Sequence, residues 1–438
     1  MAHSTDKIES KYIKNHTISY GKKESLKEQL LPEKTPAKPQ SKYIKNYKES
    51  KTARKLDINH PYVCYGIAAG AYVIYILSNS GFGISLGFPT LNFLLALALP
   101  IIMYFSREEI YFSKDLKRVY LVLLFFVGAA FISYTKMLSY QMFLKRILVM
   151  LPCITAPYIG YNTKTVKYVS FTYVIIGIIL VFDYATGGIT ANWNGNSVGM
   201  FVIFGVVWLS FISDPKQRAM LIFEIAVFAI AFVQTIATDC RSAVLALTVF
   251  ALLLYVFPKA LEKSKVFFRT IYIFCLSIPC VMAFLMNLLY NAPFAQDLND
   301  WVFEKTGKLF FSGREFIWQE AINSVSDPIL GNGHAYFSYN THNMFLTLYF
   351  NIGFLGYFLF CLFFAFIFEY LHKYFHDYIV RGSFISFISI FLMHTFENIM
   401  VQTGIISISV YFILAVGIGR ASMLEKEQKL KISEGKHV

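Results

Sequence analysis

The sequence predicts an all-α protein, a polytopic transmembrane helical bundle of about 12 spans with one large extracytoplasmic loop between spans 9 and 10. Three observations support this class. Of the 438 residues, 56% are hydrophobic, and the mean hydropathy is +0.50. Only 15% are charged, against about 25% in an average soluble domain. Several long runs carry little or no charge, among them 119–133, 168–181, 242–257 and 345–368.

The first 60 residues differ from the rest of the chain. They contain 14 Lys and Arg against seven Asp and Glu, and the segment at 10–15 recurs at 41–46. Such a stretch cannot bury enough apolar surface to fold alone. We expect residues 1–60 to form a basic, disordered cytoplasmic tail, with a lipid-surface or partner-binding role as the alternative. No cleavable signal peptide is recognisable, so the first apolar run is expected to serve as an uncleaved signal anchor.

Hydropathy then predicts a transmembrane domain over 61–419 and a polar cytoplasmic tail over 420–438. The fourth span is the shortest and the weakest. The expected spans are 62–79, 88–105, 119–134, 147–161, 167–184, 197–213, 219–237, 241–257, 268–290, 343–369, 382–399 and 402–419.

The distribution of basic residues predicts the orientation. If the N-terminus is cytoplasmic, 33 of the 40 Lys and Arg lie in cytoplasmic loops and tails, and seven lie outside. This asymmetry follows the positive-inside rule. Both termini are then cytoplasmic, and the long connection over 291–342 is extracytoplasmic. A loop of this length is usually functional.

The net charge of +13 could indicate a nucleic-acid partner, but its location beside apolar runs favours anionic membrane lipid instead. The six cysteines lie mostly inside apolar runs, without CxxC or Cys/His spacing. The sequence therefore predicts neither a metal site nor a disulfide framework.

The basic residues expected outside are candidates for binding an anion. Arg241 lies at the outer start of the eighth span, where the helix dipole also favours negative charge. The alternative is an interfacial arginine paired with Asp239. Lys136, Lys145 and Arg146 could form a second anion contact, or they could belong to a solvated loop.

The large loop contains Ser312-Gly313-Arg314 and Trp318, then Pro328 and Gly331-Asn332-Gly333, and it ends at Thr341-His342-Asn343. Thr341 and Asn343 suit a helix start.

The helix that follows carries Tyr349, Gly353 and Gly356 on the face of His342, and the two glycines permit close helix packing. A neutral imidazole at the water interface can accept a proton, although a lone histidine there can also be structural. His394 and Glu397 lie near the outer end of the eleventh span and provide too few ligands for a metal.

The order of these motifs resembles the superfamily of O-antigen ligases and O-antigen polymerases, which are bacterial membrane glycosyltransferases. Three pieces carry the resemblance: Arg241-Ser242-Ala243; Ser312-Gly313-Arg314 with Trp318, Pro328 and Gly331-Asn332-Gly333; and His342-Asn343 before Gly353-x-x-Gly356. The resemblance is best over 238–360. The long repeated tail departs from it.

The resemblance implies a transmembrane catalytic domain that transfers an undecaprenyl-diphosphate-linked oligosaccharide to a glycan acceptor outside the cytoplasmic membrane, without a metal, nucleotide sugar or other cofactor. It implies His342 and Arg241 as catalytic residues. Membrane lipid, chain-length regulator and flippase proteins are the other expected partners, and nucleic acid is not. The expected substrate-binding residues are Arg314, Arg146, Lys145, Asn343 and Tyr349.

The resemblance leaves the acceptor open. A repeat-unit polymerase of O-antigen, capsule or exopolysaccharide is the preferred interpretation, and a ligase that uses lipid A-core or a protein is the alternative. A twelve-span flippase or transporter is a more distant alternative, which predicts two similar halves. No repeat between the halves is visible in the sequence.

Overall fold

The computed structural model describes residues 113–158, 163–188, 195–212, 218–289, 292–307, 309, 313–333, 340–398 and 405–433. Every regular element over these residues is helical, so the predicted all-α class is confirmed for this part of the chain. The predicted tail over 1–60 and the first two predicted spans, 62–79 and 88–105, lie outside the described residues.

Four described helices are long and apolar enough to cross a membrane. They are α5 (Lys114–Thr135), Met220–Ala237 within α10 (Arg218–Ala237), α13 (Lys265–Leu289) and α16 (Met344–His372). Shorter apolar helices accompany them: Val169–Ala185 within α8 (Thr163–Ala185), α9 (Gly195–Val206) with η4 (Val207–Phe211), α11 (Arg241–Ala251) with η5 (Leu252–Val256), and α17 (Tyr378–Met393). The chain is therefore a membrane protein.

Three predicted spans differ in detail from the described helices. The weak span 147–161 is divided between α6 (Tyr140–Val149), α7 (Leu151–Thr155) and η2 (Ala156–Tyr158). Proline at 152 falls at the start of α7, where its missing N–H costs nothing. The eleventh predicted span, 382–399, already ends at Met393, and α18 (Ile405–Ser433) continues well into the region expected to be a polar tail.

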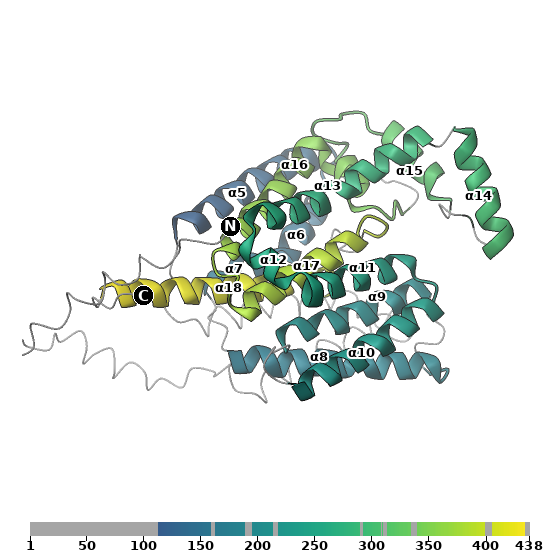
Figure 1. Cartoon of the computed structure of the whole chain (residues 1–438). Coiled ribbons are helices and arrows are strands. Elements are labelled where there is room, and N and C mark those ends of the chain that lie inside the picture. Colours follow the sequence, from purple (N-terminus) through teal and green to yellow (C-terminus); the bar gives the residue numbers. More distant parts are fainter. Residues whose placement is uncertain are drawn as a thin grey trace, which may run out of the picture. The chain divides into compact units, whose positions relative to one another are not determined.

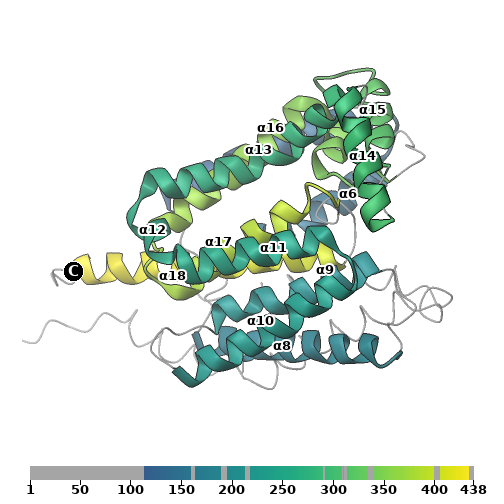
Figure 2. The same cartoon turned by 45° about the vertical axis from the view of Figure 1, so that its right-hand side comes forward.

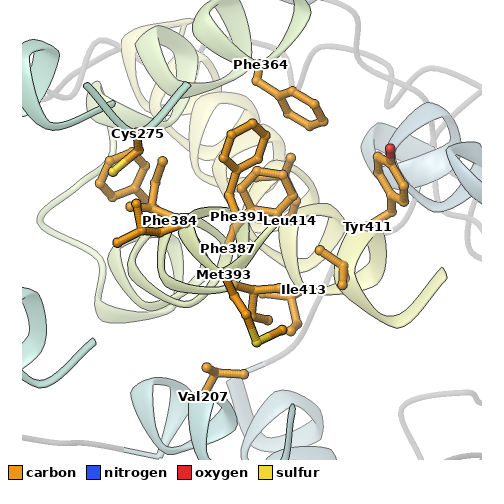
Figure 3. Packing of buried hydrophobic residues seen from close by; sticks show 14 of the residues in the cluster. Val207, Cys275, Phe364, Phe384, Phe387, Phe391, Met393, Tyr411, Ile413 and Leu414 are labelled. Atoms are coloured by element: carbon orange, nitrogen blue, oxygen red, sulfur yellow. The ribbon is translucent and has the colours of Figure 1, made fainter. Parts of the chain in front are cut away.

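Helix α17 is the central element of the described bundle. Its side chains from Gly382 to Met393 are all buried, which is expected when a helix is apolar on every face. Figure 3 shows Phe384, Phe387 and Phe391 packed among residues of α16, α18 and η4.

Small and hydroxylated residues allow α17 to approach its neighbours. Ser210 of η4 hydrogen-bonds Ser386 of α17, with 2.7 Å between the two hydroxyl oxygens. A side chain at Gly382 would meet the carbonyl oxygen of Ser210 at 2.7 Å. Such contacts stabilise helix pairs where lipid provides no hydrophobic driving force between helices.

The described helical bundle has two distinct ends. Figures 1 and 2 show α14 (Pro293–Thr306) and α15 (Arg314–Asn323) at one end and α12 (Pro258–Lys263) at the other. The described part of the predicted loop over 291–342 therefore contains two helices. The end that carries α15 is called the site end below, and the end that carries α12 is called the far end.

Candidate functional site

Three segments that are distant in the sequence meet at the site end. They are the start of α15, residues 340–343 before α16, and residues 394–398 after α17. Each segment brings a residue with a charge or a titratable group: Arg314, His342 and Glu397. The site is thus assembled from two helix starts and one helix end.

Glu397 connects the three segments. Its Oε1 accepts a hydrogen bond from Nη2 of Arg314 at 3.3 Å, and its Oε2 lies 3.0 Å from Nδ1 of His342. The Glu397 side chain is only 6% exposed, whereas those of Arg314 and His342 are 20% and 35% exposed. A buried carboxylate therefore contacts two side chains that each remain partly exposed.

Backbone and side-chain hydrogen bonds fix these segments to one another. The ring N–H of buried Trp318 donates to the carbonyl of Thr341 at 2.6 Å. The amide of Asn398 donates to Oδ1 of Asn340 at 2.7 Å. The N–H of Met344 donates to the carbonyl of His394 at 3.0 Å.

Phe396 completes the contact between these segments. Its ring lies 6.0 Å from the Arg314 guanidinium carbon and 6.5 Å from the Trp318 ring. Arg314 is consequently held by an aromatic face as well as by a carboxylate.

Asn343 organises the start of α16. Its Oδ1 accepts from the N–H of Leu346, and its amide nitrogen donates to the carbonyls of Pro279 and Thr395. The sequence predicted both a helix start and a substrate contact here. The helix start is confirmed. Because the side chain is fully buried and its polar atoms are used within the protein, we interpret Asn343 as a residue that positions His342.

His342 itself has an unusual backbone. Its φ is +48°, in the left-handed region that costs a non-glycine residue about 1 to 3 kcal/mol. Asp239, two residues before Arg241, shares this conformation with φ +54°. Strained backbone of this kind is concentrated at functional sites.

Arg241 is the first residue of α11, as predicted, and it lies beside the site. Its Nε is 3.9 Å from the Asp239 carboxylate, and both side chains are about half exposed. The pKa of Arg314 lies below its usual value mainly because the group is desolvated. The Glu397 carboxylate opposes this shift, and the positive charge of Arg241 adds to it. Two guanidinium groups thus share one electrostatic environment.

Lys145 and Arg146, expected to bind substrate, lie within α6. The Arg146 guanidinium lies 5.8 Å from the centre of the Tyr134 ring of α5, and Lys145 is half-buried. The structure does not bring either residue into the contacts of Arg314, His342 and Glu397 that are described here. Lys136 contacts the large loop instead, through the Asp327 carboxylate at 2.6 Å and the Gly331 carbonyl at 2.9 Å.

Tyr349 lies in α16 but packs into the protein. Its ring stacks on Phe345 and meets the edge of Phe354. Its side chain is largely buried. The structure therefore provides a packing role for Tyr349, and the expected substrate contact remains a prediction.

Helix α16 is broken at Gly353, which has φ +68° and ψ −172°. The loop residues Pro328 to Gly333 fill the break. Their carbonyls at Pro328 and Ile329 accept from the N–H groups of Phe354 and Leu355, and the N–H groups of Asn332 and Gly333 donate to Phe350 and Asn351. The loop motif thus satisfies the backbone groups that the break exposes.

Glu397 is the residue whose role the sequence did not predict. It was noted with His394 only as an ionisable residue near a span end. The sequence indicated only that a carboxylate lies near the end of a predicted span. Burying such a group costs free energy unless it has a partner. Among the described residues, no group of three or more His, Cys, Asp or Glu side chains could hold a metal ion.

Comparison with known proteins adds no identification. No family model matches the chain, and no curated protein or solved structure matches it either.

Proposed function

We propose that this protein is a membrane glycosyltransferase that polymerises the repeat units of a cell-envelope polysaccharide. Its donor is a polyprenyl-diphosphate-linked oligosaccharide, and its acceptor is a sugar hydroxyl. The observation that carries the proposal is the meeting of His342 and Arg314 on one buried carboxylate, with Arg241 beside them.

The chemistry needs a proton acceptor and a binding site for a departing diphosphate. With Nδ1 directed at Glu397, His342 has Nε2 left to take the proton of the attacking hydroxyl. The hydroxyl oxygen bonds to the anomeric carbon as the bond between that carbon and the diphosphate oxygen breaks. The electron pair of the broken bond leaves with the diphosphate.

The two arginines suit the leaving group. Guanidinium groups bind phosphate oxygens through several N–H donors, and positive charge fixed where negative charge develops lowers the barrier. Arg241 is half exposed and begins a helix of 11 residues, so the helix dipole adds to its charge. Arg314 is held by Glu397 and Phe396.

The location follows from the charge distribution. At the far end the described helices carry many basic residues, including Lys259, Lys263, Lys265, Arg269, Lys373 and Arg381. We place the far end and both termini in the cytoplasm and the site end outside the cytoplasmic membrane. A donor carried by a membrane lipid would then reach the site from the bilayer.

Replacement of His342 by Ala and, separately, of Arg241 by Ala in the native host tests this function. Each variant must first be shown to reach the membrane, and the surface polysaccharide is then separated on a gel. Polymerase activity predicts that long chains collapse to single repeat units on their normal anchor. Long chains that accumulate on the lipid carrier would show a ligase, and normal polysaccharide from both variants would contradict the assignment.

A further inference from the structure

We infer that Glu397 is a positioning residue that sets the proton arrangement of His342 and joins it to Arg314. This inference deepens the proposed function and rests on it for the identity of the reaction. The proton arrangement itself can be measured without turnover.

The first step concerns the tautomer. Oε2 of Glu397 lies 3.0 Å from Nδ1 of His342. A carboxylate can only accept, so the neutral imidazole must carry its proton on Nδ1 and leave a lone pair on Nε2. The second nitrogen of the ring is then the one that can accept a proton from a substrate hydroxyl.

The second step concerns orientation. The Glu397 side chain is 6% exposed, and its backbone follows the end of α17 in a segment hydrogen-bonded to residues before α16. His342 is one-third exposed and has a left-handed backbone. The buried partner thus restrains a ring that is otherwise open to the surroundings, as the third member of an acid–base triad does.

The third step concerns charge. Proton transfer to Nε2 creates an imidazolium, which the adjacent carboxylate stabilises. The other oxygen of the same carboxylate binds Arg314 at 3.3 Å. The Glu397 carboxylate is surrounded by His342 before α16, Arg314 of α15 and Cys240 at the start of α11. Arg241 at the start of α11 acts in turn on Arg314. Glu397 therefore links the proton acceptor to the cations that face the diphosphate.

The tautomer is tested by magic-angle-spinning NMR on the full-length protein in liposomes, with ¹⁵N-labelled histidine. The His342 signal is identified as the one lost in His342→Gln. We expect the neutral ring to carry its proton on Nδ1 in the wild type and to become a mixture of tautomers in Glu397→Gln. A wild-type ring with its proton on Nε2 would overturn the inference, and this spectrum requires no change at Glu397.

A double-mutant cycle supplies the second readout, with a lipid-linked oligosaccharide as donor. Glu397→Gln should slow transfer roughly 100-fold, since general acid–base catalysis contributes about 10² to 10⁴. In a His342→Ala background the same change should alter the residual rate by less than about threefold, because residues that act as a unit are not additive. Equal losses in both backgrounds would show a merely structural role and contradict the inference.

The two proposals can fail separately. If wild-type protein transfers no glycan from any lipid-linked donor, the proposed function is wrong, and the tautomer still decides the role of Glu397. If transfer occurs but the wild-type proton lies on Nε2, the proposed function stands and the inference does not.

Discussion

The two ends of the bundle use charged residues in different ways. At the far end, carboxylates pair with lysines and arginines of neighbouring helices, and the Glu369 pair is in contact with the surroundings. Glu369 binds Arg269 through two hydrogen bonds of 2.6 and 2.9 Å, with 26% and 48% of the two side chains exposed. At the site end, Glu397 is 6% exposed and shared between an arginine and a histidine.

The far end contains several further pairs of a carboxylate with a lysine or an arginine, and they differ in exposure. Lys373 contacts Asp115, and Arg420 contacts Asp377 at 2.9 Å. Arg381 lies 3.3 Å from Glu262. The pair of Lys373 and Asp115 joins the end of α16 to the start of α5, and both side chains are exposed enough that the pair contributes little to stability. The pair of Arg420 and Asp377 joins α18 to the start of α17 and is largely buried.

The difference shows that the kind of partner identifies the site, because Glu397 is shared between an arginine and a titratable histidine. Burial alone does not identify it, since Asp377 at the far end is only 10% exposed. A buried carboxylate is costly to desolvate and must keep its partners. Glu397 lies beside a histidine with a strained backbone, and this favours a chemical role for Glu397 over a purely structural one. Four sets of substitutions test this difference between the two ends.

The largest effect is expected at Gly353, where the site-end loop enters α16. A Cβ there would overlap the Ile329 carbonyl oxygen, and the φ of +68° is unfavourable for alanine. Gly353→Ala should therefore cost about 5 kcal/mol or more and prevent normal folding. The measurement is the yield of monodisperse protein and its thermal unfolding in detergent.

Gly128→Ala is the matched control in α5. A Cβ at Gly128 meets nothing within 4 Å, so this change should be neutral or slightly stabilising by up to about 1 kcal/mol. Equal behaviour of the two variants would show that the break in α16 does not require glycine.

The second effect compares the two carboxylates directly. Glu397→Ala leaves the mostly buried Arg314 without its ion-pair partner and should destabilise the protein by about 3 kcal/mol. Glu369→Ala at the far end should cost about 1 kcal/mol, because its partners remain in contact with solvent. Thermal unfolding of both variants measures the difference, and a larger loss for Glu369→Ala would reverse our interpretation of the two ends.

The sequence predicted the positions of the apolar helices well because apolar runs of spanning length leave few alternatives. It also predicted Arg241 at a helix start and Asn343 at another. Glu397 could not be assigned a partner, since it is 55 residues from His342 and 83 from Arg314, and only the fold brings them together.

Gly353 was predicted to allow close helix packing, but the structure shows a break filled by the loop motif at 328–333. Hydropathy cannot reveal such a break, because both halves of the helix are apolar. Arg146 was expected to bind substrate because it clusters with Lys136 and Lys145 on the expected outer side, and this stays a prediction. In the structure its guanidinium lies 5.8 Å from the centre of the Tyr134 ring.

The third effect is the pH dependence of stability that an exposed ion pair at the site end confers. Hydrogen bonding to Lys136 lowers the pKa of Asp327 from its usual value of 3.8 to about 2. Because the folded-state pKa is the lower one, the pair stabilises the protein above about pH 4, and this contribution disappears as the pH falls through about 2.

Asp327→Asn tests this dependence. The wild type should unfold at a slightly higher temperature than the variant at pH 6, and the two should converge as the pH approaches 2. A difference that persists unchanged to pH 2 would mean that Lys136 does not act through the Asp327 carboxylate.

The fourth and smallest effect concerns activity at the far end. Arg269→Lys keeps the charge opposite Glu369 but loses the two-pronged geometry. Glycan transfer should change by less than about twofold, since this pair lies at the opposite end from His342. A tenfold loss, measured with the same donor and acceptor, would place the far end in the reaction.

The most direct test of the account is the rate of glycan transfer by purified protein in lipid vesicles. A polyprenyl-diphosphate-linked oligosaccharide serves as donor, and wild type, His342→Ala and Arg269→Lys are compared. We predict that the wild type lengthens the glycan, that His342→Ala is slower by about 100-fold or more, and that Arg269→Lys matches the wild type. Transfer at the wild-type rate by His342→Ala would contradict the assignment of the site.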